Sequence, residues 1–510
     1  MKKLWSDMHS NIHHRQMDNL DQWIEEARAR LDFWPIAYYP FQLVRRAGGA
    51  VLEDLCPQAE IARDWELIRC RTEEVNREGY PMFMGYEWQG NGGDGDHNVF
   101  FLHNDRQMLH PMTYAELAVA CGEGAIGIPH HLAYQLGSRG KNWATHKERF
   151  SPFAEVFSSH GCSENDTGDL DMERHLHMGP RTGETCYERG LERGLRVGCI
   201  ASGDNHTIPG VCDHGSMCVL AESNAKEDIW AGLMARRVYG VSRSRMEIDF
   251  TVGGVPLGGG VAAGTHEMRI QVRAADAIDR VEILKDNILE TMVVHSGSWE
   301  RKEHPNGKTL RVKFAAEFGW GPNPRIYPDR LVREWIGAFT TSGRLLTVEK
   351  LWNNAGQRLL HQDERGCDFR LKTYMSTDTG HWMGPSRVMK EGFVFEVEGT
   401  PEDQTILRVN GHEYAFTLRE LMKTSRILAD YDESLHLAQD TFGDISHYRD
   451  DLIWHNAYKC RLRQAVPEEA YTLAYASPIT LEAGSQVRLR VHLKNGDRAW
   501  VSPVFAESRL

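Results

Sequence analysis

The 510-residue sequence predicts an α/β barrel in its N-terminal half, followed by a mostly antiparallel β half. Apolar segments of strand length alternate with amphipathic helices as far as about residue 245, a pattern typical of a parallel sheet. Several of these segments end in a carboxylate or an imidazole, as barrel strands do at their C-terminal rim. We therefore expect a barrel over residues 1–245 and a β-rich, sandwich-like accessory domain over residues 246–510.

The first strand-like segment shows the pattern most clearly. Leu4 and Trp5 begin a short apolar strand that runs into a burst of polar residues, namely Asp7, His9, Asn11, His13 and His14. Similar endings recur at Glu87, at His130 and His131, at Glu155 and His160, and at Asp204 and His206. Because the carboxyl ends of barrel strands meet at one rim, these five endings predict a single metal centre.

The remaining elements follow from periodicity. Residues 19–31 place Leu20, Trp23 and Ile24 on one helical face. Further helices are expected at 58–78, 114–121, 184–193 and 225–237, with strands at 33–39, 81–88, 125–129, 197–201 and 238–241. Beyond residue 245, Ile248, Phe250 and Val252 alternate with polar residues, and similar alternation near the C-terminus predicts antiparallel strands.

Composition narrows the function classes. The net charge of -13 argues against a nucleic-acid partner, which would need a basic face. No apolar run approaches the ~20 residues of a membrane span, and nothing resembles a signal peptide. The ten cysteines are scattered without metal-ligand spacing, as expected of reduced core cysteines. We expect a soluble, cytoplasmic protein with no nucleic-acid or membrane partner.

The candidate ligands indicate the kind of metal. Histidine and carboxylate ligands without cysteine suit Mn²⁺, Fe²⁺ or Zn²⁺, and a carboxylate such as Glu87 can bridge two ions. The polar loop 132–151 carries Arg139 and Lys141. These two are either solvated charges or, together with His131, contacts to an anionic substrate.

Several motifs, in order, resemble a known family. DMHSN from Asp7, GYE ending at Glu87, HNV from His97, PHH ending at His131 and SGDNH ending at His206 resemble the polymerase-and-histidinol-phosphatase (PHP) family of metal-dependent phosphoesterases. The likeness covers roughly the first 245 residues. It is greatest for a poorly characterised branch with EVFSSHG-like and SGDNH-like stretches and a β-rich C-terminal extension. It implies a distorted (β/α)7 barrel with up to three metal ions.

The resemblance also assigns site residues. It implies the metal ligands His9, Glu87, His97, His130, Asp204 and His206. It also implies that Asp7 lies behind His9 and supports it. We expect Asn11 and Glu155 in similar supporting positions, with a salt bridge as the alternative for Glu155. The chain departs from the family at Asn11, where a second histidine is usual, and at Tyr38 and Tyr39, which stand where the family has Asp-His. We therefore expect one or two ions. The candidates to replace the missing family ligands are His13, His14, Asp18 and His160.

These observations predict a metal-dependent hydrolase, most simply a phosphoesterase that uses a metal-activated water. Asp204, His206 and His160 are the candidate catalytic residues. Two alternatives stay open. One is hydrolase or lyase chemistry on a non-phosphate substrate in an amidohydrolase-like barrel. The other is a non-catalytic glycan- or protein-binding protein with a degenerate metal site. The expected partner is a small-molecule substrate, and an anionic substrate is one option. Assembly into a homo-oligomer is left open.

Overall fold

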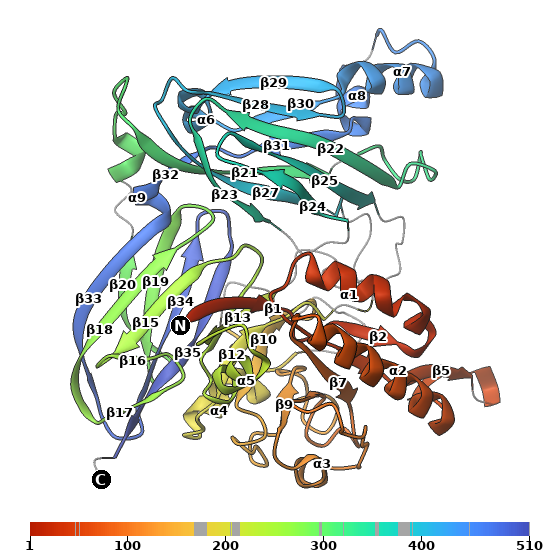
Figure 1. Cartoon of the computed structure of the whole chain (residues 1–510), viewed down its shortest axis with the longest axis vertical. Helices are drawn as coiled ribbons and strands as arrows, with labels where there is room; N and C mark the ends of the chain where they lie inside the picture. The colour runs from red at the N-terminus through yellow and green to blue at the C-terminus, as the bar shows by residue number, and fades with distance from the viewer. Residues whose placement is uncertain are drawn as a thin grey trace.

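The computed structural model shows an α/β part and two β-sandwiches (Figure 1). It describes residues 1–45, 47–49, 51–167, 181–204, 206, 215–294, 298–319, 321–351, 356–375, 388–389, 391–447 and 449–508. None of the helices in these ranges is long and apolar enough to span a bilayer. All cysteines in the same ranges are free thiols, and most are buried.

The α/β part contains a six-stranded and a three-stranded sheet. The larger sheet has the order β2 (Asn11–His13), β4 (Ala37–Tyr39), β7 (Met82–Trp88), β8 (His97–Phe101) and β9 (Ala125–Pro129), with β3 (Trp34–Pro35) also on β7. The smaller sheet has the order β11 (Gly161–Cys162), β10 (Phe153–Ser158) and β12 (Gly198–Ala201). A separate hairpin joins β5 (Phe41–Arg45) to β6 (Val51–Leu55).

Within the described ranges, five helices accompany these strands. They are α1 (Leu20–Arg28), α2 (Gln58–Arg77), α3 (Tyr114–Cys121), α4 (Tyr187–Glu192) and α5 (Lys226–Met234). The predicted helical face of α1 is confirmed, because Leu20, Trp23 and Ile24 are buried. Helix α3 begins at a capping box, in which the Thr113 hydroxyl accepts the Glu116 N–H. Short 3₁₀ turns are η1 (His14–Asn19), η2 (Ala47–Gly49), η4 (Gly183–Thr185) and η5 (Ser298–Arg301).

The strand pairing is mixed rather than parallel throughout. Strands β2 and β4, β4 and β7, and β10 and β12 pair in parallel, whereas β7–β8 and β8–β9 are antiparallel. The short connection between β7 and β8 has no crossover helix, which a parallel pair would require. Strand β9 contacts β10, and β12 contacts β14, but no ladder between described strands joins these pairs. The α/β class is therefore observed, and closure into a (β/α)7 barrel stays a prediction.

The first sandwich combines strands from both ends of the chain. Its larger sheet has the order β1 (Lys2–Ser6), β13 (Ser216–Ala221), β14 (Val238–Val241), β35 (Arg498–Glu507), β34 (Gln486–Leu493), β19 (Ile278–Lys285) and β20 (Ile288–Val294), with β17 (Gly260–Ala262) on β35. The facing sheet has the order β16 (Val255–Pro256), β15 (Glu247–Val252), β18 (Gly264–Arg273) and β33 (Thr472–Leu481). The predicted alternation in β15 is confirmed, since Ile248, Phe250 and Val252 are buried in the shared core. The larger sheet crosses residue 245, and the division into domains there stays a prediction.

The second sandwich is inserted in the chain between β20 and β33. One sheet has the order β23 (Arg344–Lys350), β27 (Glu391–Gly399), β21 (Leu310–Gly319), β31 (Lys459–Leu462) and β30 (Arg426–Ala429), with β32 (Val466–Pro467) on β21. The other has the order β24 (Arg358–Gln362), β25 (Gly366–Met375), β22 (Val332–Thr341), β28 (Gln404–Val409) and β29 (His412–Thr417), with β26 (Val388–Met389) on β25. Its short helices are α6 (Leu418–Lys423), α7 (Tyr431–Phe442), α8 (Asp451–Asn456) and α9 (Glu468–Tyr471). Phenylalanines such as Phe314, Phe339 and Phe395 form its core.

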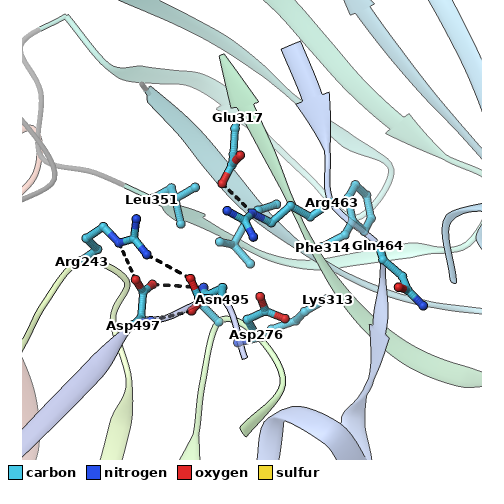
Figure 2. Close-up of a pocket in the computed structure, with 13 residues that line it drawn as sticks. Arg243, Asp276, Lys313, Phe314, Glu317, Leu351, Arg463, Gln464, Asn495 and Asp497 are labelled. Atoms are coloured by element: carbon cyan, nitrogen blue, oxygen red, sulfur yellow. Dashed lines mark hydrogen bonds and ion pairs between the residues drawn. The ribbon is translucent and has the colours of Figure 1, made fainter. Parts of the chain in front are cut away.

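A small polar cavity lies where the two sandwiches meet (Figure 2). On one side, Arg243 Nε donates to Asp497 Oδ1 at 2.5 Å. On the other, Arg463 Nε donates to Glu317 Oε1 at 2.6 Å. Asp276 also lines the cavity, and burial raises its pKa to about 6 despite the nearby Arg463. The cavity is therefore lined by one charged pair from each sandwich, around a carboxyl group that resists ionisation.

Candidate metal centre

His9 lies at the middle of the candidate site, in the turn between β1 and β2. Its ring is completely buried, and Nδ1 lies 2.9 Å from Glu155 Oε2. Its Nε2 lies 3.2 Å from Asp204 Oδ1 and 3.8 Å from Glu87 Oε2. If Nδ1–H donates to Glu155, the Nε2 lone pair faces the other two carboxylates, the arrangement that a metal-binding imidazole needs.

Asp7 ties the two loops of the site together. Its Oδ1 accepts the backbone N–H groups of His9 and Gly203, both at 2.9 Å, and its Oδ2 accepts the Ser10 hydroxyl at 3.1 Å. Burial raises the pKa of Asp7 to about 6, although these hydrogen bonds oppose the rise. The loop after β12 leaves β geometry at Asp204, which has a φ of 53° in the left-handed region.

Three sets of buried side chains bring potential ligand atoms within 4.8 Å of one another. Among the described residues these sets are His9–Glu87–His130, Asp96–His130–His131 and His131–His160–Asp204. His130 and His131 each belong to two sets, so the three sets form one continuous cluster. We call the seven residues of these three sets the ligand cluster: His9, Glu87, Asp96, His130, His131, His160 and Asp204.

The ligand cluster fits a divalent cation. Within the part of the chain that the structure describes, both ring nitrogens of His130, Nε2 of His131 and Oε1 of Glu155 are buried without a hydrogen-bond partner. Each such group costs roughly 1–3 kcal/mol if it stays unsatisfied, and a cation would satisfy several at once. Imidazole and carboxylate donors without thiolate suit Mn²⁺, Fe²⁺ or Zn²⁺.

The electrostatics of the site also favour a cation. Burial alone would lower the pKa of His9, but Asp204 and Glu155 outweigh it and raise this pKa well above its usual value. Burial likewise opposes ionisation of Glu87, yet the hydrogen bond and charge of His9 lower its pKa to about 2. The buried carboxylates therefore require positive charge next to them.

His206 lies beside the ligand cluster rather than inside it. Its Nε2 is 3.4 Å from Asp204 Oδ1, and its Nδ1 is 2.8 Å from His13 Nε2. The His206 side chain is 29% exposed, whereas Asp204 is buried. The Tyr39 ring packs against both histidines. His13, His206 and Tyr39 thus form an edge of the site that is partly open to solvent.

His97 points away from the ligand cluster. In the β7–β8 ladder Glu87 pairs with Asn98 and Trp88 pairs with His97, so His97 lies on the opposite face from Glu87. Its Nδ1 donates to the Gly95 carbonyl at 3.0 Å, and its Nε2 lies 3.3 Å from Lys141 Nζ. Lys141 is only 1% exposed, and burial lowers its pKa to about 7. The structure therefore brings neither residue into the cluster.

The other predicted substrate contacts lie near Asp96, which the sequence reasoning missed. Arg139 Nη1 donates to Asp96 Oδ2 at 2.6 Å, and the same oxygen lies 2.9 Å from His131 Nδ1. Asp96 ends a Gly-, Asn- and Asp-rich loop directly before His97, and that loop was the available signal. His160 Nε2 lies 2.7 Å from Asp204 Oδ2, and its Nδ1 lies 2.6 Å from the Tyr134 hydroxyl. Nothing in the sequence marked Tyr134.

The side chains at the three positions that depart from the family pattern all form hydrogen bonds. Asn11 Nδ2 donates to Glu87 Oε2 at 2.8 Å and lies 3.4 Å from His9 Nε2. The Tyr38 hydroxyl donates to Asp64 at 2.9 Å, and the Tyr39 hydroxyl donates to Glu53. His14 also binds carboxylates of α2, with Nδ1 2.5 Å from Asp64 and Nε2 2.9 Å from Glu60. Of the candidates to compensate, His160 is the one inside the cluster.

Comparison with known proteins finds a distant structural likeness. No protein-family model and no curated protein matches the chain. One of the solved structures that match is a two-domain protein from Bacteroides vulgatus ATCC 8482, described as containing a predicted PHP-like metal-dependent phosphoesterase. It is 12% identical, covers 82% of this chain and 95% of its own, and has a TM-score of 0.30. This likeness is too distant to assign a family or a function.

Proposed function

We propose that the protein is a metal-dependent hydrolase of the phosphoesterase type, with a PHP-like barrel and one or two divalent ions in the ligand cluster. The continuity of the cluster, with its unsatisfied imidazole nitrogens, is the observation that carries this proposal. The order of the sequence motifs, which resembles that of the PHP family, supports the reaction type.

The cluster divides into two potential cation positions. His9, Glu87 and His130 would hold one ion, and His131, His160 and Asp204 would hold the other. Bound ions of this kind polarise a phosphoryl oxygen and lower the pKa of a coordinated water. Glu155 supports the first position because it fixes the His9 ring.

The open edge supplies the groups for substrate. His206 and His13 present ring nitrogens 2.8 Å apart, next to the Asp204 carboxylate. Since those two nitrogens bond each other, His206 Nε2 is the atom on this edge that is suited to hold a proton near a departing oxygen. Arg139 adds positive charge on the Asp96 side. A small phosphate ester is the substrate class that this combination fits best.

Metal analysis of the full-length chain, coupled to a substrate screen, tests the proposal. After treatment with chelator, the protein is reloaded with Mn²⁺, Fe²⁺ or Zn²⁺ and assayed on phosphomonoesters, phosphodiesters and carboxylic esters. Glu87→Gln should lose metal and phosphoesterase activity together without loss of folded structure. Glu317→Gln, which changes a similarly buried carboxylate in the second sandwich, is the matched control.

The outcomes separate the alternatives. Metal-dependent hydrolysis of carboxylic esters alone would favour the amidohydrolase-like alternative. A native protein that takes up no metal, or equal metal content in wild type and Glu87→Gln, would refute the metal centre and favour the binding protein.

A further inference from the structure

The hairpin that presents His160 to Asp204 is short and tightly bound. Phe157 pairs with Cys162 and Ser158 with Gly161, which leaves Ser159 and His160 at the tip. Gly161 has a φ of 103°, a conformation that a side chain would strain. The Ser159 hydroxyl donates to Asp204 Oδ2 at 3.3 Å, beside the His160 contact to the same oxygen. The place of this tip therefore decides whether His160 reaches the cluster.

Glu164 follows the hairpin directly and is held from the other end of the chain. Arg490 Nε of β34 donates to Glu164 Oε1 at 2.7 Å, and Trp500 Nε1 of β35 donates to Oε2 at 2.9 Å. Arg488 Nη1 donates to Oε1 as well. The Trp500 ring also stacks on Phe157, with centroids 5.2 Å apart and planes at 22°. The last two strands thus contact the hairpin at Phe157 of β10 and bind Glu164 just beyond β11.

The charges around Glu164 fix its position. Glu164 is 4% exposed, and burial would raise its pKa, but Arg488 and Arg490 outweigh burial and lower it. The same two arginines reach Glu188 of α4, at 2.5 Å and 3.1 Å. A buried carboxylate that accepts from two guanidinium groups and an indole N–H is fixed in orientation, because moving it would break charge-assisted hydrogen bonds.

We propose that Glu164 is a positioning residue for His160, and that Arg488, Arg490 and Trp500 make the C-terminal strands part of the metal centre. This inference rests on the proposed function, since it assigns His160 to a bound ion. Loss of a group that hydrogen-bonds a ligand typically weakens metal binding by ~10–100-fold, and Glu164, which acts on His160 through the hairpin, should have an effect at the lower end of that range. A purely structural contact would instead lower stability and leave the metal affinity of the folded protein unchanged.

The test compares Glu164→Gln and Arg490→Lys with Glu317→Gln in the full-length protein. Glu317 is also buried and also paired with an arginine, Arg463, but it lies in the second sandwich. Apoprotein is titrated with Co²⁺, whose visible absorption reports the ligands, and thermal unfolding is measured in parallel. Hydrogen exchange of residues 156–165 follows the hairpin without any metal.

The two hairpin variants should bind Co²⁺ about 10-fold more weakly, with an altered spectrum and faster exchange. Glu317→Gln should match wild type in all three.

Each outcome is decisive. Wild-type Co²⁺ affinity, spectrum and exchange in both hairpin variants would overturn the inference and leave the proposed function standing. Equal weakening in Glu317→Gln would also overturn it, because the effect would then follow general stability. A wild-type protein that binds no Co²⁺ would overturn the proposed function and the inference with it. Arg490→Lys keeps the charge, so it decides the matter if Glu164→Gln fails to fold.

Discussion

Replacement of Glu155 by glutamine isolates the contribution of the group behind His9. Glu155 is 2% exposed, and its Oε2 lies 2.9 Å from His9 Nδ1. Glutamine has nearly the same volume and keeps an acceptor oxygen, but it removes the charge. The substitution therefore leaves packing in place and weakens the bond that fixes the His9 ring.

The size of the effect follows from that one bond. A hydrogen bond to a charged group contributes about 1.5–3 kcal/mol, and a neutral one about 1 kcal/mol. The loss is therefore about 0.5–2 kcal/mol, which corresponds to a metal affinity roughly 2–30-fold weaker. Burial keeps the contribution near the upper end, because no solvent screens the pair.

Competition with a chromophoric chelator measures this affinity, with thermal unfolding as a check on the fold. Glu317→Gln again serves as control, since it removes a buried carboxylate charge outside the site. Affinity equal to that of wild type would refute the orienting role. A loss greater than about 1000-fold would also refute it, because that size indicates a direct ligand rather than a supporting group.

Three further predictions concern other positions. Asn11→His should raise the metal content by about one ion per chain, because an imidazole would replace the amide that now binds Glu87; an unchanged content by elemental analysis would contradict this. His97→Gln should leave the metal content unchanged, because this ring faces Lys141 on the other side of the sheet; a loss as large as that of Glu87→Gln would restore it as a ligand. The pKa of Asp276 is about 6 in the folded protein against an ordinary 3.8, so the folded state binds the extra proton between these values and loses stability as the pH rises through them. Asp276→Asn should therefore stabilise by about 1–3 kcal/mol at pH 8 and by almost nothing at pH 4 in denaturant titrations, and an equal gain at both would argue against it.

Local periodicity predicted individual elements well. The apolar face of α1 and the alternation in β15 depend on neighbouring residues, and both are confirmed. The partners of the strands have no such local signal. Strand β18 pairs with β33 about 200 residues further along the chain, across the whole second sandwich. Nothing in either segment encodes that distance, so the sequence indicated one β-rich region where the structure has two sandwiches.

The site was predictable where a candidate ligand lies at the end of a strand or within a few residues after it. His9, Glu87, His130 and Asp204 come together in the structure as the strand-end argument expects. The same strand-end argument was displaced by one residue at the start of β8. Asp96 lies in the ligand cluster, whereas His97 points to the opposite face. Because successive strand residues alternate between faces, a one-residue uncertainty in where a strand begins exchanges an inward group for an outward one.

The pairing of β14 with β35 has a consequence for how the protein is made. Strand β14 ends at Val241 and its partner begins at Arg498, about 257 residues later. At a synthesis rate of roughly 5–20 residues per second, this edge waits about 13–50 s for its partner to leave the ribosome. During that interval the edge of β14 that pairs with β35 has no partner, and the facing sheet lacks β33. The nascent chain is therefore exposed to misassembly with other chains, and efficient production should depend on chaperones that shield this edge until the last strand arrives.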